Sequence, residues 1–384
     1  MGTPFTVALV LLAILLGAGF AFDSEEPKPE SRAAVRTVPI RTLEARVEQI
    51  RALRFRTLPQ PDQVSPAQAR RDGLEDLDRT YPATRRHADE AVLRQLGLLP
   101  PGVDLRDVSA TLFGQGVAGY YDPRSKRLRI VTGAQTENRV LEEITLAHEL
   151  THALEDQRFE LDLESPSSDD AGLAHLSLVE GSATQVMLTY AERHFSPEQT
   201  LGGLLASLGQ DTGSLPPFVE AQLIFPYVEG QRFVQRLYAT GGDTWSLVDS
   251  AYRFRPPAST EQILHPDKYL QVEQPDRVRL RTEPGPGWRR VRAGTWGEWA
   301  TGQLVGADAA EGWGGDRYAL WQRGGDDALL MRWRWDSKVA ARRFAAALTA
   351  WRAGRPGASA VRSRGLEVAL ALAPDAGLAQ RLVQ

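Results

Sequence analysis

The sequence contains no cysteine, and this absence excludes several kinds of chemistry. Without thiols the chain can form no disulfide bond, no thiolate nucleophile and no cysteine-ligated metal site. Any metal ion must therefore be held by histidine, aspartate, glutamate or the backbone. If the protein is exported, the lack of disulfides also favours a bacterial source over an animal one.

Lysine and net positive charge are scarce too. Of 45 basic residues only Lys28, Lys126, Lys268 and Lys338 are lysines, and the formal net charge is −4. Acidic and basic residues are mixed along the sequence and form no basic stripe, which phosphate binding requires. We therefore expect no nucleic-acid partner. With 384 residues, 42% of them hydrophobic, the chain can form one large domain or two modest ones.

The N-terminus is apolar from residue 4 to residue 22, and no acidic or basic side chain precedes Asp23. The small residues Gly19 and Ala21 predict a signal peptide, residues 1–21, that is cleaved after Ala21. An uncleaved membrane anchor through residues 4–22 is the alternative, because no basic residue precedes the run and roughly 19 residues can span a bilayer. In both cases we expect the folded part outside the cytoplasm, as a secreted, periplasmic or membrane-anchored protein.

Composition and periodicity divide the remainder into regions. Residues 22–37 are acidic and proline-bearing, which is typical of a disordered linker. Residues 38–110 carry apolar residues at helical spacing and predict an N-terminal helical subdomain, with a pro-segment as the alternative. From residue 111 to residue 270 we expect a hairpin around Asp122, long helices over 137–159 and 171–194, and further helix with breaks at Pro226 and Gly241.

The character of the sequence changes at about residue 271. Seven of the nine tryptophans lie between Trp288 and Trp335, in strand-and-turn sequence. Met331, Trp333 and Trp335 alternate with arginines, so they predict a strand with one apolar face that packs in a core, with carbohydrate stacking as the alternative. A helix over 337–353, capped by Asp336, and a last strand over 366–373 complete a smaller α+β C-terminal domain, residues 271–384.

The run AHELTHALEDQ contains the most specific chemical signal in the chain. His148 and His152 are two of only six histidines, and they lie four residues apart in a predicted helix. Residues at this spacing project from one face, so both imidazoles can reach one metal ion. Glu149, next to the first histidine, can take a proton from a water molecule whose pKa the cation lowers. This is the HExxH pattern of zinc hydrolases.

A catalytic zinc site needs a third protein ligand. Glu180 is the strongest candidate, because a loop over 162–170 lets its helix fold back against the histidines. Gly181 beside it removes a side chain and permits close helix approach. The alternatives are Asp156, Asp162, His175 and His194.

These residues resemble a known family. HELTH followed by a helical glutamate in VEGSA resembles the gluzincins, in which two histidines and a downstream glutamate bind zinc. More specifically, the chain is similar to a group of bacterial exported HExxH proteins from about residue 42 onward. The shared strings are GYYDP (119–123), HELTHALEDQ (148–157), VEGSA (179–183) and STEQILHPDKY (259–269).

The resemblance implies an α+β fold, with a mainly helical zincin-like catalytic domain over residues 111–270 that carries a small edge sheet. It also implies Zn²⁺ as cofactor, and a strand over Leu128–Val131 at the sheet edge, where an extended peptide can pair. Zincins often place a tyrosine or histidine opposite the base, and the candidates for this transition-state stabiliser are Tyr190, Tyr227 and His265.

The sequence thus predicts an exported zinc metallopeptidase that hydrolyses a peptide or protein substrate. His148, His152 and Glu180 would hold the metal and Glu149 would act as general base. The alternative is a non-catalytic binding or scaffolding protein with a structural or degenerate zinc site. The intact Glu149 favours catalysis, because holding zinc does not require it.

Overall fold

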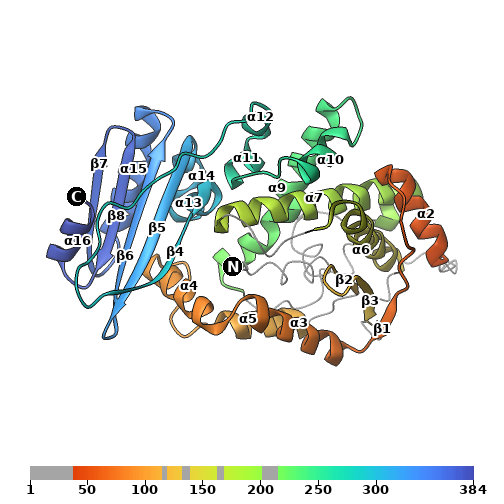
Figure 1. The fold of residues 1–384 in the computed structure, drawn as a ribbon, viewed down its shortest axis with the longest axis horizontal. Helices are drawn as coiled ribbons and strands as arrows, with labels where there is room; N and C mark the ends of the chain where they lie inside the picture. Colours follow the sequence, from red (N-terminus) through yellow and green to blue (C-terminus); the bar gives the residue numbers. More distant parts are fainter. Residues whose placement is uncertain (1–37, 115–118, 132–138, 162–167, 201–214) are drawn as a thin grey trace.

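The structure is a computed structural model that describes residues 38–114, 119–131, 139–161, 168–200 and 215–384. The apolar segment 4–22, the linker 22–37 and the candidate ligand Asp162 lie outside the described residues. The fold is α+β, as expected: helices predominate up to residue 270, and a β-sheet with its own helices follows (Figure 1). Among the described residues, no helix has both the length and the apolar character needed to cross a bilayer.

The first part of the chain is mainly helical. The predicted helices over 137–159 and 171–194 are confirmed as α6 and α7, but the expected break at Pro226 is wrong. Pro226 is buried within α9 between Phe225 and Tyr227, and packing of this face outweighs the missing backbone hydrogen bond. The helices are α2 (Ile40–Arg51), α3 (Pro66–Thr80), α4 (Ala83–Gln95), α5 (Leu105–Gly114), α6 (Arg139–Phe159), α7 (Asp169–His194), α9 (Pro217–Thr240), α10 (Ser246–Arg253), α11 (Thr260–Leu264) and α12 (Pro266–Leu270).

A small sheet lies beside the motif helix α6. Its strands are β1 (Asp62–Val64), β2 (Gly119–Asp122) and β3 (Arg127–Val131), in the order β1-β3-β2. The predicted hairpin is confirmed, because β2 and β3 pair antiparallel with Tyr121 opposite Leu128. The prediction that Leu128–Val131 forms the edge is wrong: β1 pairs in parallel with β3 and makes it the central strand. A strand of three residues carries too short a pattern to be recognised from sequence.

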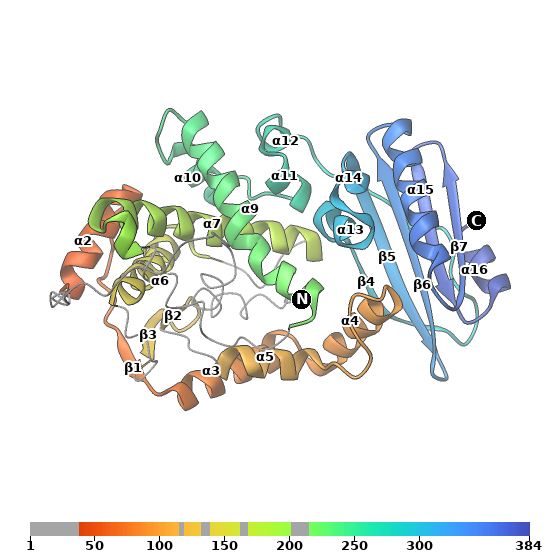
Figure 2. The same cartoon turned by 180° about the vertical axis from the view of Figure 1, so that it is seen from behind.

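The C-terminal domain is a five-stranded antiparallel sheet with helices on both faces (Figure 2). Alternate residues of its strands point to opposite faces. On one face, Met331 and Trp333 pack against Phe344 of the helix α15, and on the other Leu330 packs with Leu378 of the helix α16. The elements are β4 (Arg289–Gly294), α13 (Gly297–Val305), α14 (Ala307–Ala310), β5 (Trp313–Arg323), β6 (Asp326–Trp335), α15 (Lys338–Ala353), β7 (Ala358–Arg364), β8 (Glu367–Ala373) and α16 (Ala376–Leu382).

Two details of this domain bear on the predictions. Met331, Trp333 and Trp335 are fully buried, which confirms core packing for these side chains. The expected cap Asp336 is wrong, since Ser337 accepts the backbone N–H of Ala340 and caps α15. Asp336 instead binds the ammonium of Lys268.

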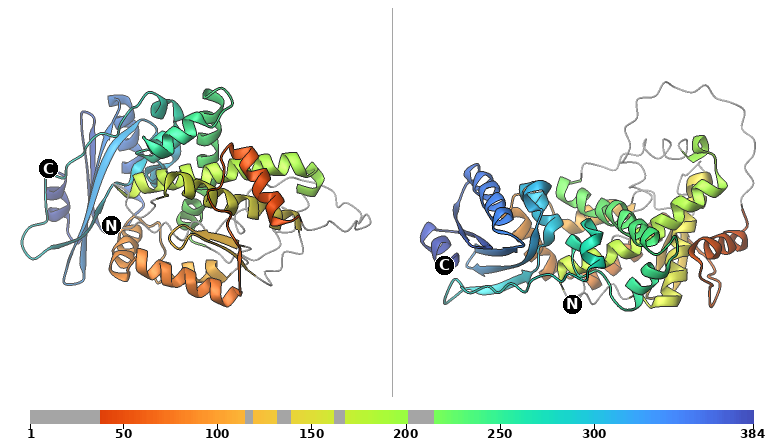
Figure 3. Two further views of the ribbon diagram at one scale, coloured as in Figure 1. Left: turned by 45° about the vertical axis from the view of Figure 1, so that its right-hand side comes forward. Right: turned by 90° about the horizontal axis from the view of Figure 1, so that it is seen from above.

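Residues 38–110 contribute side chains to several cores. In α2, Leu43 and Val47 belong to the same core as the motif helix α6. In α4, Leu93 belongs to that core too, whereas Val92 belongs to the core of the C-terminal sheet. The helices α2 and α4 lie well apart (Figures 1 and 3). This segment therefore contacts both the motif helix and the C-terminal sheet.

The string STEQILHPDKY forms the joint between the two halves. The backbone N–H and hydroxyl of Thr260 both donate to Asp170 Oδ1 at the start of α7, at 3.0 and 2.6 Å. Five residues later, His265 Nε2 lies 2.9 Å from Glu298 Oε1 of α13. Lys268 binds Glu261 and also reaches Asp336 of the C-terminal domain. The polar residues of this string thus link α7 to the C-terminal domain.

The buried carboxyl group of Asp170 predicts that the stability of the fold depends on pH. The variant Asp170→Asn tests this prediction. Burial raises the pKa of Asp170 to about 7, although the two bonds from Thr260 oppose this. Because the pKa of Asp170 is higher in the folded than in the unfolded state, its protonated form stabilises the fold. This contribution is fully present below the unfolded-state pKa of about 4 and is lost as the pH rises toward 7. Asparagine keeps the acceptor and cannot ionise. The Tm of Asp170→Asn relative to wild type, measured by calorimetry, should therefore increase between pH 5 and pH 8. A Tm difference that does not change with pH would contradict the assignment.

Candidate metal centre

The histidines of the motif lie on the buried face of α6. Leu141, Ile144, Leu150 and Leu154 are all buried around them, as expected for a helix inside the molecule. The exposed fractions of His148 and His152 are 1% and 0%, so neither side chain is a surface histidine. Their Nε2 atoms face each other at 2.9 Å, one helical turn apart.

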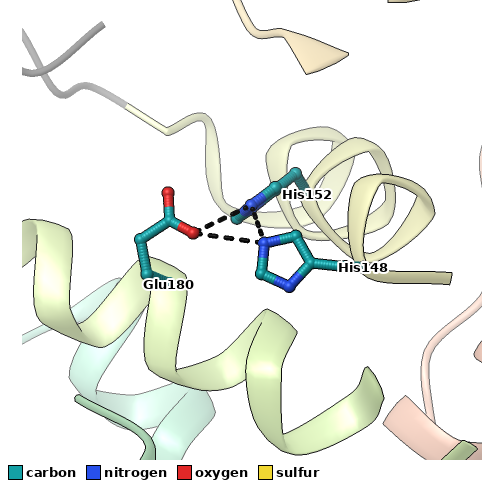
Figure 4. Close-up of side chains that lie close together, drawn as sticks. All are labelled: His148, His152 and Glu180. Carbon is teal, nitrogen blue, oxygen red and sulfur yellow. Dashed lines mark hydrogen bonds and ion pairs between the residues drawn. The ribbon is translucent and has the colours of Figure 1, made fainter. Parts of the chain in front are cut away.

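Helix α7 brings Glu180 to the same point (Figure 4). Its Oε2 lies 3.2 Å from His148 Nε2 and 3.4 Å from His152 Nε2, and its side chain is fully buried. Burial alone raises the pKa of Glu180, but the two imidazoles outweigh it and hold the pKa down to about 2. A buried carboxylate that remains ionised between two imidazoles is a good ligand for a cation.

The separations of the three atoms fit a zinc ion. Zinc binds histidine nitrogen and carboxylate oxygen at roughly 2.0–2.2 Å in tetrahedral sites, which places ligand atoms about 3.3 Å apart. The observed separations of 2.9, 3.2 and 3.4 Å lie close to this value. Two histidines and one carboxylate also form the donor set of many catalytic zinc sites, which leave a fourth position for water or substrate.

A second group of carboxylates in the described residues does not have this character. Glu261, Glu273 and Asp336 could offer three oxygens to a metal. The ammonium of Lys268 already lies among them, at 2.6, 2.8 and 2.6 Å from the three carboxylates. A protein cation therefore already lies among these carboxylates, and His148, His152 and Glu180 are the better candidate metal site.

Glu149 lies beside the three atoms and is held by the small sheet. The backbone N–H of Tyr121 in β2 donates to its Oε2 at 2.8 Å. Burial raises the pKa of Glu149 to about 8, and the charge on Glu180 adds to this while His152 opposes it. A carboxyl group with a pKa near neutrality can both take and return a proton.

The other candidates for the third ligand have different surroundings. Asp156 accepts the hydroxyl of Tyr121 at 2.6 Å and binds the ammonium of Lys126 at 2.7 Å. His194 packs against the ring of Tyr190, three turns beyond Glu180 on α7. In the described part of the chain, neither of these residues, nor His175, belongs to the group that converges with the two motif histidines.

Only one of the three proposed transition-state stabilisers lies at this centre. The ring of Tyr227 stacks on that of His148 with centroids 6.1 Å apart. Burial and the charges of Glu180 and Glu149 raise the pKa of Tyr227 well above its usual range, so its hydroxyl stays protonated. Tyr190 instead donates to Glu143 at 2.5 Å, and His265 lies at the joint with the C-terminal domain.

A pair of glycines explains how Tyr227 reaches the centre. A Cβ atom on Gly181 would lie 2.2 Å from the carbonyl of Gly230 in α9, and one on Gly230 would lie 2.1 Å from the carbonyl oxygen of Ser177. A close helix approach does occur at Gly181, but its partner is α9 and not the motif helix α6 that was expected. Tyr227 lies three residues before Gly230, on the same face of α9, and so it faces α7.

A buried polar network around Glu155, close to the candidate metal centre, was not predicted from the sequence. Arg51 of α2, fully buried, donates to Glu155 at 2.5 Å and to Asp249 at 2.7 Å. Glu155 also accepts from Ser182 of α7 and from Tyr252 of α10. Glu155 follows His152 by three residues and Ser182 follows Glu180 by two, so the network fixes α6 and α7 beside the ligands. The proximity of Glu155 to the motif was a usable signal, whereas nothing local pointed to Arg51.

Comparison with known proteins covers only the C-terminal domain. Residues 285–381 match a family described as "Domain of unknown function (DUF8575)". This range contains the whole sheet from β4 to β8 and none of the residues of the metal centre. No curated protein and no solved structure matches the chain.

If Glu180 is the third ligand, zinc binding should depend on its carboxylate and not on that of Asp156. Glu180→Gln keeps the size of the side chain but removes its charge, so zinc affinity should fall by a factor on the order of 100 or more. Asp156→Asn is the matched control, because Asp156 is an equally buried carboxylate on α6. Zinc content after dialysis, measured by mass spectrometry, should fall in the first variant only. Full zinc content in Glu180→Gln, or loss in Asp156→Asn, would overturn the assignment.

The glycine pair predicts a loss of stability in Gly230→Ala. Because the new methyl group would meet the backbone of α7, no side-chain rotation can relieve the contact. We expect a loss of about 1–3 kcal/mol in the free energy of unfolding, despite the better helix propensity of alanine. Gly354→Ala is the control, since a Cβ there has no atom within 4 Å. Urea denaturation measures both, and an unchanged midpoint in Gly230→Ala would refute the close contact.

Proposed function

We propose that the protein is an exported zinc-dependent metallopeptidase that hydrolyses peptide bonds. The observation that carries the proposal is the convergence of His148, His152 and Glu180 beside the buried carboxyl group of Glu149. A bound zinc ion supplies Lewis-acid activation of water and polarisation of the carbonyl group. The proposed location outside the cytoplasm depends on the apolar sequence of residues 4–22.

The side chains of the protein would carry out proton transfer and stabilise the developing charge. Glu149 takes a proton from the attacking water, whose oxygen adds to the carbonyl carbon of the peptide bond. The same carboxyl group then gives the proton to the leaving nitrogen, the C–N bond breaks, and a carboxylate and an amine leave. The Tyr121 N–H holds one oxygen of Glu149 in place during these steps. Tyr227 has a protonated hydroxyl that hydrogen-bonds Glu180, and it would turn from there to donate to the developing negative charge on the carbonyl oxygen.

The small sheet offers a place for the peptide backbone. In the sheet order β1-β3-β2, the strand at the edge beside α6 is β2. The backbone N–H of Tyr121 points away from β3, since it donates to Glu149. An extended peptide beside this edge would lie next to Glu149 while the Tyr121 N–H stays bonded to Glu149, and we assign to β2 the role that was expected of Leu128–Val131.

A structural zinc site is the second candidate function. Full burial of all three candidate ligands is typical of closed structural sites, where zinc stabilises the fold. Glu149 separates the two candidate functions, because a structural zinc site has no use for a second carboxyl group held beside the candidate ligands.

Glu149→Gln therefore tests catalysis. The amide keeps the shape of the side chain and can no longer accept a proton, so kcat should fall by a factor on the order of 100–10,000. Zinc content should stay at the wild-type level, because Glu149 is not among the converging ligand atoms. Cleavage of a broad peptide library by zinc-loaded protein, followed by mass spectrometry, measures the effect. Equal cleavage rates in wild type and variant would refute the peptidase proposal.

A further inference from the structure

An apolar cavity of about 180 Å³ lies between the helical part and the C-terminal domain. Its walls come from α3, α4, α5, α7 and α9 and from the start of α13. An apolar cavity of roughly 150 Å³ holds a benzene-sized group, so this one can hold an aromatic or a branched aliphatic side chain. Protein interiors are otherwise close-packed, so an apolar cavity of this size is a candidate binding site.

The cavity lies one helical turn from residues of the proposed metal centre along two helices. On α7, Leu173 and Leu176 line the cavity, and Glu180 follows Leu176 by one turn on the same face. On α9, Leu223 lines it, and Tyr227 follows by one turn. Four residues of helix span roughly 6 Å, so the cavity begins about two peptide residues from the centre.

The charged groups at the cavity wall neutralise one another. Arg85 binds Asp169 at 2.8 Å, and Arg292 binds both Asp169 and Asp89. Asp170 is held by Thr260. The two arginines balance Asp89 and Asp169, and Asp170 is bonded to Thr260, so the largely apolar wall favours a neutral, apolar occupant.

The place of the cavity favours a peptide over a plain hydrocarbon as its occupant. The cavity lies one helical turn from Glu180 on α7 and from Tyr227 on α9. A side chain near a peptide bond held at the proposed centre can therefore reach it. Trp296 and Phe218 form part of the apolar wall, with ring centroids 5.9 Å apart.

We propose that this cavity is a specificity pocket that binds a large apolar side chain of the peptide substrate. The inference rests on the proposed peptidase function and names its substrate class. Leucine or phenylalanine at one fixed position, a few residues from the cleaved bond, would occupy the pocket. Alanine there would leave it unfilled and would lose the apolar contacts.

Filling the pocket from α5 tests this proposal. Ser109 lines the cavity, and its hydroxyl donates to the carbonyl of Leu105 within the same helix. Ser109→Phe therefore places a ring in the cavity and leaves no partner in another element unpaired. Thr111→Phe is the matched control, because Thr111 lies on the exposed side of the same helix. Thermal melts check that both variants fold, and Ser109→Leu replaces the larger substitution if Ser109→Phe does not.

The substrates are peptides that differ only in carrying Leu or Ala, placed in turn at each position around the cleaved bond. Wild type and Thr111→Phe should prefer Leu at one position by a factor on the order of ten or more in kcat/KM. In Ser109→Phe this preference should fall toward one, with unchanged zinc content. Binding of the same peptides to zinc-loaded Glu149→Gln, followed by fluorescence polarisation, should show the same dependence on Ser109.

The outcomes separate the two proposals. Cleavage without a positional preference, or with one that Ser109→Phe leaves intact, overturns the pocket and leaves the peptidase standing. Peptide binding that depends on Ser109, without cleavage by wild type, keeps the pocket and removes the peptidase. A third outcome would contradict the choice of a peptide side chain as occupant. In it, the wild type binds a labelled fatty acid, Ser109→Phe abolishes this binding, and the same variant leaves cleavage and binding of peptides unchanged.

Discussion

The approach of α6 and α7 is the constraint on which the rest of the structure depends, because it brings two imidazoles and a carboxylate together in the protein interior. Such groups cost free energy to bury unless they are paired with one another or with a cation. Here the carboxylate of Glu180 lies between His148 and His152, and a second polar network around Glu155 holds the same two helices from below. The fully buried Arg51 supplies the positive charge that Glu155 needs. The two networks together hold the candidate ligand atoms in place.

Close packing on the other side of α7 completes the centre. Gly181 and Gly230 let α9 approach the backbone of α7, and this approach places Tyr227 against His148. The N-terminal end of the same pair of helices widens into the apolar cavity, which the C-terminal domain closes with Trp296 and Trp299. The string STEQILHPDKY joins the domain to α7 at this point through Thr260 and Asp170. The C-terminal domain thus contributes to the environment of the centre, although it contains none of the proposed ligands.

Local patterns in the sequence predicted the parts of this arrangement that local geometry determines. The spacing of His148 and His152, the helices α6 and α7, the β2–β3 hairpin and the buried face of Trp333 all follow from periodicity within one element. Long-range pairing was not predictable in this way. Three features depend on contacts between distant segments: the three-residue strand β1, the salt bridge from Arg51, and the packing of residues 38–110 against two cores. The choice of Tyr227 over Tyr190 and His265 as candidate transition-state stabiliser also required the structure. The sequence does not show which helices pack against one another.

The central claim is that His148, His152 and Glu180 hold one zinc ion, and anomalous X-ray scattering from crystals of the purified, zinc-loaded protein tests it most directly. Difference maps from data collected on both sides of the zinc absorption edge locate the metal independently of the surrounding atoms. The account predicts a single strong peak at roughly 2.0–2.2 Å from both Nε2 atoms and from an oxygen of Glu180. A peak bound by other residues, or none at this place in zinc-loaded crystals, would contradict it.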